Sequence, residues 1–473
     1  MTKNLSADAN GNRKAEEGVA QSRGRVLDSQ HWQGRLDELR AAHHVPGAAL
    51  ALVVDDQIHE FASGVLHMGT GVEATADSVF QLGSVAKIYT ATLIMRLVDT
   101  GELDLDATVS DILPGFAVAD AEAGKMITVR QLLTHTSGLS GDFHYDSGRG
   151  DDCLARYVEA CTDLKLDCPN GSGLSYSGSG YIILGRIAEV ITGLTWDQAL
   201  RERVLTPLGL EHTMTLPEEA LRFRVAMSHL GGAGAYPEPA PVWDFQSRAA
   251  APAARVLATV GDLARFARTH LRGGEENLSP QTVAAMQQRA VDSPDKWTIS
   301  ADGWGLGWTL YDWNGTPGYG HDGSAVGQFS YLRVVPGAGV AIALLTNGGS
   351  TRQLYNDLFG ELLAELAEVR MPEPFGPAAQ PPVVDWTPLI GTYRREGVKL
   401  TVTEGRLLYE FVDGMAGISP ALDVELAPVT AAVFAGSGAG PSFNDDYMPV
   451  VFSTLSDGTA CVYVGMRATP KIA

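Results

Sequence analysis

The chain has 473 residues, of which 35 are basic and 56 acidic, giving a net charge of −21 and an isoelectric point near 4.9. Apolar residues make up 45% of the chain, which is long enough and apolar enough to bury more than one core. The acidic balance disfavours binding to nucleic acid or to an anionic membrane, because both repel a negatively charged surface.

The beginning of the chain is polar. Residues 1–25 lack the apolar run of a secretory signal, and no run of about 18 apolar residues occurs anywhere. We therefore expect a disordered lead at 1–25, no transmembrane helix and a cytoplasmic protein.

Helices and strands of a first unit follow in chain order. A helix is predicted at 27–42, then a buried strand at 45–54 and its hairpin partner at 57–64. Further helices are predicted at 88–97, 128–133, 180–192, 195–208 and 259–271. Strands at 304–311, 328–335 and 339–347 and a helix at 354–369 complete the unit. The sheet is therefore built from both ends of this region, with helices inserted between.

A proline-rich stretch then marks a domain boundary. Five prolines in residues 371–382 indicate a linker. Beyond it, short alternating segments predict a small antiparallel sheet or barrel, at 391–394, 399–402, 406–411, 424–428, 447–452 and 460–467. We divide the chain into a lead (1–25), a main domain (26–370), a linker (371–385) and a C-terminal β-domain (386–473).

The cysteines and histidines indicate neither a metal site nor a cofactor. The four cysteines are Cys153, Cys161, Cys168 and Cys461, and their spacing matches no zinc pattern. No His-Glu-x-x-His motif occurs. We expect reduced cysteines, no metal and no cofactor.

The most informative stretch is Ser84-Val85-Ala86-Lys87. A lysine three residues after a serine lies one helical turn away on the same face, where its amine can take the hydroxyl proton. The lysine acts as a base only if its pKa falls, which burial and neighbouring cations produce. Taken alone, the tetrapeptide favours the simpler interpretation, a helix cap at Ser84 and a solvated Lys87.

Two other places could complete a site with Ser84. Tyr176 precedes a helix among small residues and could act as a phenolate base or as a phenolic proton donor. His321 lies in Gly320-His321-Asp322-Gly323-Ser324, whose glycines permit close backbone approach and whose N–H groups could form half of an oxyanion hole. The alternatives are a core tyrosine and a surface histidine.

Together these motifs resemble the penicillin-recognising serine hydrolases, in the branch of class C β-lactamases, DD-peptidases, D-aminopeptidases and family VIII esterases. The flanking phrases at 80–87, 132–139, 180–185 and 207–210 agree with that branch, and the resemblance covers about residues 30 to 370. It implies a β-lactamase/transpeptidase-like α/β (α+β) fold, with an antiparallel sheet flanked by helices and an all-helical insertion. Leu389-Ile390-Gly391-Thr392-Tyr393 resembles the opening of a lipocalin-like barrel, which some members append.

The resemblance also implies roles for particular residues. Ser84 corresponds to the acylated nucleophile, Lys87 to its amine partner, and Tyr176 to the Tyr-x-Asn tyrosine. His321 takes the place of the Lys-Thr-Gly lysine, and the backbone N–H groups of Ser84 and Ser324 correspond to the oxyanion hole. The same resemblance assigns His135 a structural role. We expect the substrate to contact Gly178, Asp322 and Gly323.

Two departures shape the expected function. Gly178 replaces the Tyr-x-Asn asparagine, and His321 replaces a permanently charged lysine with a group that titrates near neutrality. Both argue against strong β-lactamase activity. We expect an acyl-Ser84 intermediate that passes its acyl group to water or an amine, as in esterases, peptidases, transacylases or the peptide cyclases of antibiotic biosynthesis.

The expected donor is a small molecule or a peptide, free or carrier-bound, and a homodimer is left open. The alternatives are a true β-lactamase or DD-peptidase, and a non-catalytic sensor with the same fold.

Overall fold

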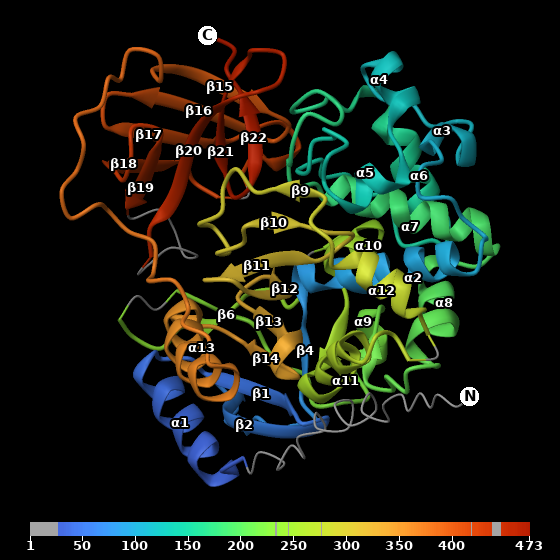
Figure 1. The fold of residues 1–473 in the computed structure, drawn as a ribbon, viewed down its shortest axis with the longest axis vertical. Coiled ribbons are helices and arrows are strands. Elements are labelled where there is room, and N and C mark those ends of the chain that lie inside the picture. Colours follow the sequence, from blue (N-terminus) through green and yellow to red (C-terminus); the bar gives the residue numbers. More distant parts are fainter. Residues whose placement is uncertain (1–26, 232–233, 245, 276, 418, 438–445) are drawn as a thin grey trace, which may run out of the picture.

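Two antiparallel sheets, each built from its own part of the chain, organise the molecule (Figure 1). The computed structural model describes residues 27–231, 234–244, 246–275, 277–417, 419–437 and 446–473. The lead predicted at 1–25 lies outside these residues. None of the described helices is both long and apolar enough to cross a bilayer.

The larger sheet has nine strands in the order β3-β2-β1-β14-β13-β12-β11-β10-β9. Its strands are β1 (Gly47–Val54), β2 (Gln57–His67), β3 (Val72–Glu73), β9 (Val291–Asp292), β10 (Gly303–Trp304), β11 (Thr309–Trp313), β12 (Thr316–Ser324), β13 (Phe329–Val335) and β14 (Val340–Thr346). Since β1 pairs with β14, the sheet does join the two ends of this region.

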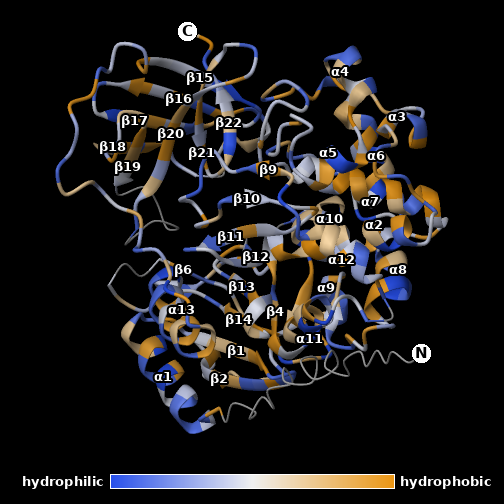
Figure 2. Ribbon diagram, in the orientation of Figure 1, coloured by the Kyte–Doolittle hydropathy of each residue, from blue (hydrophilic) through white to orange (hydrophobic). Residues whose placement is uncertain are grey.

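Both faces of this sheet are buried. Alternate residues of β1 enter different cores: Leu50 and Leu52 pack with the α1 and α13 side, whereas Ala51 and Val53 pack with the α2 side. Helices α1 (Ser29–Ala42) and α13 (Thr351–Ala367) cover the first face, and α2 (Ala86–Asp99) and α11 (Val260–Leu271) the second. Figure 2 shows hydrophobic residues along β1 and polar ones on the outward side of α1.

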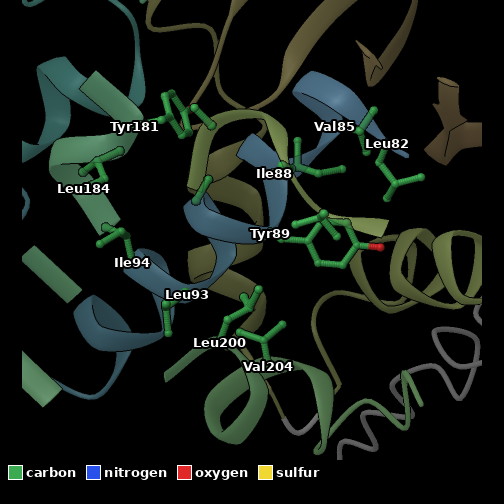
Figure 3. Close-up of a cluster of buried hydrophobic side chains, with 14 of the residues drawn as sticks. Leu82, Val85, Ile88, Tyr89, Leu93, Ile94, Tyr181, Leu184, Leu200 and Val204 are labelled. Atoms are coloured by element: carbon green, nitrogen blue, oxygen red, sulfur yellow. The ribbon is translucent and has the colours of Figure 1, made fainter. Parts of the chain in front are cut away.

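A helical lobe is inserted between β3 and β9. Its helices are α3 (Val109–Ile112), α4 (Ala121–Met126), α5 (Val129–Leu133), α6 (Cys153–Ala160), α7 (Gly178–Thr192), α8 (Trp196–Leu200), α9 (Pro217–Ala220), α10 (Ala251–Ala254) and α12 (Pro280–Met286). Small sheets also form here, from β4 (Val79–Gln81), β5 (Thr213–Met214) and β8 (Leu257–Thr259), and from β6 (His229–Leu230) and β7 (Glu238–Pro239). Figure 3 shows Leu93 and Ile94 of α2 buried against this lobe.

The smaller sheet is an eight-stranded, nearly closed antiparallel barrel in the order β15 to β22. Its strands are β15 (Gly391–Arg395), β16 (Val398–Thr403), β17 (Arg406–Phe411), β18 (Leu422–Pro428), β19 (Val433–Ser437), β20 (Met448–Thr454), β21 (Ala460–Val464) and β22 (Arg467–Pro470). A bridge between Tyr393 and Lys471 brings its two ends together. Its interior is filled by side chains such as Phe434 and Phe452, so it has a packed core.

The predicted fold class is thus confirmed, and several predicted strands are wrong in detail. The strand predicted at 304–311 is two strands, because Gly305 to Gly307 turn the chain and Gly307 adopts a φ of 92°. The predicted strands do not include β12, whose end carries the glycine-rich segment at 320–324. The segment at 460–467 turns after β21 into β22, and β19 was missed.

Hydrogen bonds and ion pairs connect the barrel to the main domain. The Tyr176 N–H donates to the Met466 carbonyl oxygen at 3.0 Å, and the Ala468 N–H to Ser175 Oγ at 3.2 Å. The Asp142 carboxylate pairs with both Arg395 and Arg467 of the barrel. The turn between β21 and β22 therefore lies beside the helical lobe rather than in solvent.

Replacing Arg395 should destabilise the protein far more than replacing its neighbour Arg394. Arg395 has a 2% exposed side chain that bonds Asp142 and Thr469, so its loss removes one of the two cations that pair with Asp142 and the donor to Thr469. Arg394 pairs with Asp413 and is 44% exposed. In urea unfolding we expect Arg395→Met to cost about 3 kcal/mol and Arg394→Met less than about 1 kcal/mol. Equal losses would contradict this account of the interface.

Candidate active site

Ser84 lies where the chain turns into the central helix. Residues Gly83–Val85 form a single 3₁₀ turn directly before α2. Gly83 has a φ of 53°, and a Cβ there would lie 2.4–2.5 Å from the backbone of Ser324. Only glycine permits both the conformation and this close approach. The serine is thereby held against the end of β12.

Lys87 is buried beside Ser84. Its side chain emerges one turn further along α2, and the residue is only 2% exposed. Its Nζ lies 3.3 Å from Ser84 Oγ and donates to the carbonyl oxygen of Ala253 at 2.7 Å. The same nitrogen lies 4.6 Å from the ring centroid of Tyr176 and 5.7 Å from that of Tyr181. In the described part of the chain no carboxylate forms an ion pair with it.

This environment disfavours a charged amine. Burial lowers the pKa of Lys87 well below its usual range, and the positive charge of Arg467 lowers it further, against a smaller opposing effect of Asp142. A neutral Lys87 can accept the Ser84 proton. The environment thus provides what a serine nucleophile requires from its base.

Tyr176 faces the same amine from the loop before α7. It is buried, and within the described structure its hydroxyl has no hydrogen-bond partner. Burial raises the pKa of Tyr176 to about 12, although the Ser84 hydroxyl acts in the opposite direction. Of the two roles considered from the sequence, this favours a phenol that donates a proton over a phenolate base.

His321 lies on β12 with its ring buried and neutral. Its Nδ1 lies 2.6 Å from the carbonyl oxygen of Asp322, so that nitrogen carries the proton, and the described residues offer Nε2 no partner. Burial, followed by repulsion from Lys87, lowers the pKa of His321 to about 3. The residue is therefore a hydrogen-bond acceptor toward the site at neutral pH.

The end of β12 provides an open backbone edge beside Ser84. Residues 321–324 pair with β13, whereas β11 pairs only as far as Gly320, so within the described chain their other edge has no strand partner. A Cβ at Gly323 would lie 2.0 Å from the Leu82 carbonyl oxygen, which also accepts a hydrogen bond from Ser330 Oγ at 2.7 Å. This close packing suits an oxyanion hole formed by the N–H groups of Ser84 and Ser324.

Asp322 points to the opposite face of the strand. Its carboxylate pairs with the buried Arg333, whose guanidinium lies 4.5 Å from the ring centroid of Tyr311 and 4.9 Å from that of Tyr355. Alternation along the strand thus separates this carboxylate from His321. On the Ser84 side of the strand, Asp322 contributes only its backbone atoms.

The turn that carries Tyr176 is fixed by His135. The Ser177 N–H donates to His135 Nδ1 at 3.0 Å, and the Ser175 N–H to the His135 carbonyl oxygen at 2.9 Å. Gly178 begins α7, and a Cβ there would approach only the Gly141 carbonyl oxygen, at 3.1 Å. The geometry gives His135 a structural role, and any side chain at Gly178 would pack tightly against the Gly141 backbone.

The structure adds three residues to those predicted. Trp304 places its ring 4.9 to 5.6 Å from those of His135, Tyr176 and His321. Arg467 lies 5.1 Å from the ring centroid of Tyr176, and Asp142 pairs with it. No local motif marks any of the three, because their roles depend on contacts between distant segments.

Comparison with known proteins identifies the family. Residues 32–365 match the Beta-lactamase family, so the chain belongs to it, and the resemblance to penicillin-recognising serine hydrolases is confirmed. The chain is 62% identical over 376 residues to Penicillin-binding protein 4 of Amycolatopsis lactamdurans, a match covering 78% of this chain and 99% of that protein. It is therefore related to serine hydrolases.

Solved structures extend the similarity to the barrel. The fold matches SurE with a TM-score of 0.77 at 29% identity, covering 94% of this chain and 99% of SurE. A structure of SurE with D-Leu matches equally broadly, with a TM-score of 0.75. D-amino acid amidase from Ochrobactrum anthropi, at 23% identity, shares the fold over 71% of this chain and 99% of its own, with a TM-score of 0.58.

Substituting Gly83 should remove activity, at some cost in stability. In Gly83→Ala the new Cβ meets the Ser324 backbone and separates the two proposed oxyanion donors, so we expect a loss of about a hundredfold or more in acylation of Ser84. Gly71→Ala is the matched control, because Gly71 also has a positive φ but has open space around it. Equal acylation rates in the two variants would contradict this geometry.

Proposed function

We propose that this protein is a serine acyl-transfer enzyme, in which Ser84 attacks an ester or amide carbonyl and the acyl group then passes to an amine or to water. One observation carries this proposal: the buried Lys87 amine has no acidic partner in the described structure and lies 3.3 Å from Ser84 Oγ. A binding protein without catalysis has no need for such a base.

The proposed reaction has two steps. Lys87 takes the Ser84 proton as Oγ bonds to the carbonyl carbon, and the backbone N–H groups of Ser84 and Ser324 stabilise the oxyanion. The neutral Tyr176 phenol can then protonate the leaving group. In the second step an amine or water loses a proton to the same groups and displaces Oγ, which regains its hydrogen.

The proposed substrates contain D-configured amino-acid residues. The support is comparative, since SurE was crystallised with D-Leu and a fold relative is a D-amino acid amidase. Arg467 is 25% exposed beside Tyr176, and it offers a permanent cation to a carboxylate where the neutral His321 offers none.

A penicillin-binding DD-peptidase is the second candidate. The name of the 62% identical relative favours it, and the two candidates share the acyl-Ser84 step. The two candidate functions differ in the acyl donor, so a panel of acyl donors distinguishes them.

Intact-mass spectrometry should detect an acyl group on Ser84. The panel comprises esters, thioesters, D-amino amides and β-lactams, with Ser84→Ala as the matched control. We expect adducts from peptide-like esters or amides in the wild type, and a loss of more than about a hundredfold in turnover in the variant. A folded Ser84→Ala variant that retains turnover would exclude this nucleophile.

Benzylpenicillin should be a poorer substrate than a simple p-nitrophenyl ester. His321 has a pKa of about 3, so it stays neutral at any working pH and cannot pair with the penicillin carboxylate as a lysine would. His321→Lys should improve penicillin acylation and slow ester cleavage, as measured by steady-state kinetics. Efficient penicillin hydrolysis by the wild type, faster than ester cleavage, would favour a β-lactamase instead.

A further inference from the structure

The ring of Tyr176 contacts two basic side chains, one from each structural unit. Lys87 of α2 places its Nζ 4.6 Å from the ring centroid, and Arg467 at the start of β22 places its guanidinium carbon 5.1 Å from the same point. Since one ring contacts both, the Arg467 guanidinium lies close enough to the buried Lys87 amine to affect its protonation.

Arg467 is held in place by its own surroundings. Its Nε lies 3.0 Å from Asp142 Oδ1, and its Nη1 donates to the Gly465 carbonyl oxygen at 3.0 Å. The preceding residue, Met466, accepts a hydrogen bond from the Tyr176 N–H. The guanidinium is therefore fixed relative to the tyrosine.

We propose that Arg467 is a positioning residue of the acylation site, through which the C-terminal barrel places a fixed positive charge beside the buried Lys87 amine. The inference rests on the proposed acyl-Ser84 reaction and adds a function for the barrel. Arg467 acts through Lys87, whose amine takes the proton from Ser84.

The charges around Lys87 support this role. The titratable or charged groups that face it or its immediate surroundings are Tyr176, Tyr181, His135, His321, Arg467 and Asp142. Burial lowers the pKa of both histidines and raises that of both tyrosines, so all four are neutral. Among the described residues around Lys87, this leaves Arg467 and Asp142 as the charged groups.

Asp142 does not cancel Arg467, because it also pairs with Arg395. One carboxylate between two guanidiniums leaves one net positive charge. The neighbouring Asp167 adds less than a full negative charge at neutral pH, since burial raises its pKa to about 7. The barrel thus presents a positive field to the amine, and repulsion disfavours a second positive charge there.

The test is the pKa of Lys87, measured by NMR on protein labelled with ¹³C at lysine Cε. The chain has eight lysines, and Lys87→Met assigns the signal. Arg467→Gln should raise the Lys87 pKa by about one unit, and Arg467→Lys should restore most of the wild-type value. Arg467→Met serves as a second neutral variant if the glutamine variant does not fold.

The matched control is Arg406→Gln, which removes the same charge from β17 of the same barrel. Arg406 pairs with Asp423 at the surface, so the Lys87 pKa should not change. An unchanged pKa in a folded neutral variant of Arg467, or an equal change in Arg406→Gln, would overturn the inference.

A kinetic measurement separates this inference from the proposed function. The substrate is a neutral ester, which has no carboxylate to contact Arg467. In Arg467→Gln the apparent pKa of the acidic limb of the acylation pH–rate profile should rise by the same one unit. At a pH on the acidic limb of the wild-type profile, the acylation rate of the variant should then be about tenfold lower. Absence of acyl-enzyme in the wild type with every donor would refute the proposed function, whereas acylation with an unshifted limb would refute only the role of Arg467.

Discussion

A buried lysine amine, with no acidic partner among the residues that the structure describes, is the constraint on which the site depends. Most buried lysines pair with a carboxylate, because an isolated charge in a protein interior costs several kcal/mol. Here the surroundings of Lys87 are a carbonyl oxygen, two aromatic rings and a fixed cation. The carbonyl oxygen and the two rings accommodate either form of the amine, whereas burial and the Arg467 cation lower the pKa of Lys87 and so disfavour an ammonium ion. The adjacent Ser84 hydroxyl is then the natural proton donor to that amine.

The neighbouring elements pack closely around this arrangement and hold its atoms in position. Gly83 and Gly323 remove the side chains that would separate the serine turn from β12, and His135 fixes the turn that carries Tyr176. The barrel contacts the same turn through Met466 and Ala468. An appended domain with a packed interior thus contributes to the main domain through one turn and its ion pairs.

Much of this could be predicted from the sequence. The Ser84 and Lys87 spacing, the Tyr176 turn and the glycines around His321 carry local signals, and the helix at 180–192 and the strand at 45–54 have clear patterns. Other features have no such local signal in the sequence. The split at Gly305 to Gly307 interrupts an apolar run that looks continuous, and β12 is obscured by its glycines. The places of Arg467, Asp142 and Trp304 depend on how the barrel docks, which no local pattern records.

The most direct test of the central claim is the pH dependence of Ser84 labelling by a fluorophosphonate, which reacts with an activated serine. If Lys87 is a neutral base, labelling proceeds at neutral pH with an apparent pKa well below the ordinary value of 10.5, and Lys87→Met abolishes it while the fold survives. A labelling rate that rises only toward pH 10, or one that Lys87→Met leaves unchanged, would contradict this account.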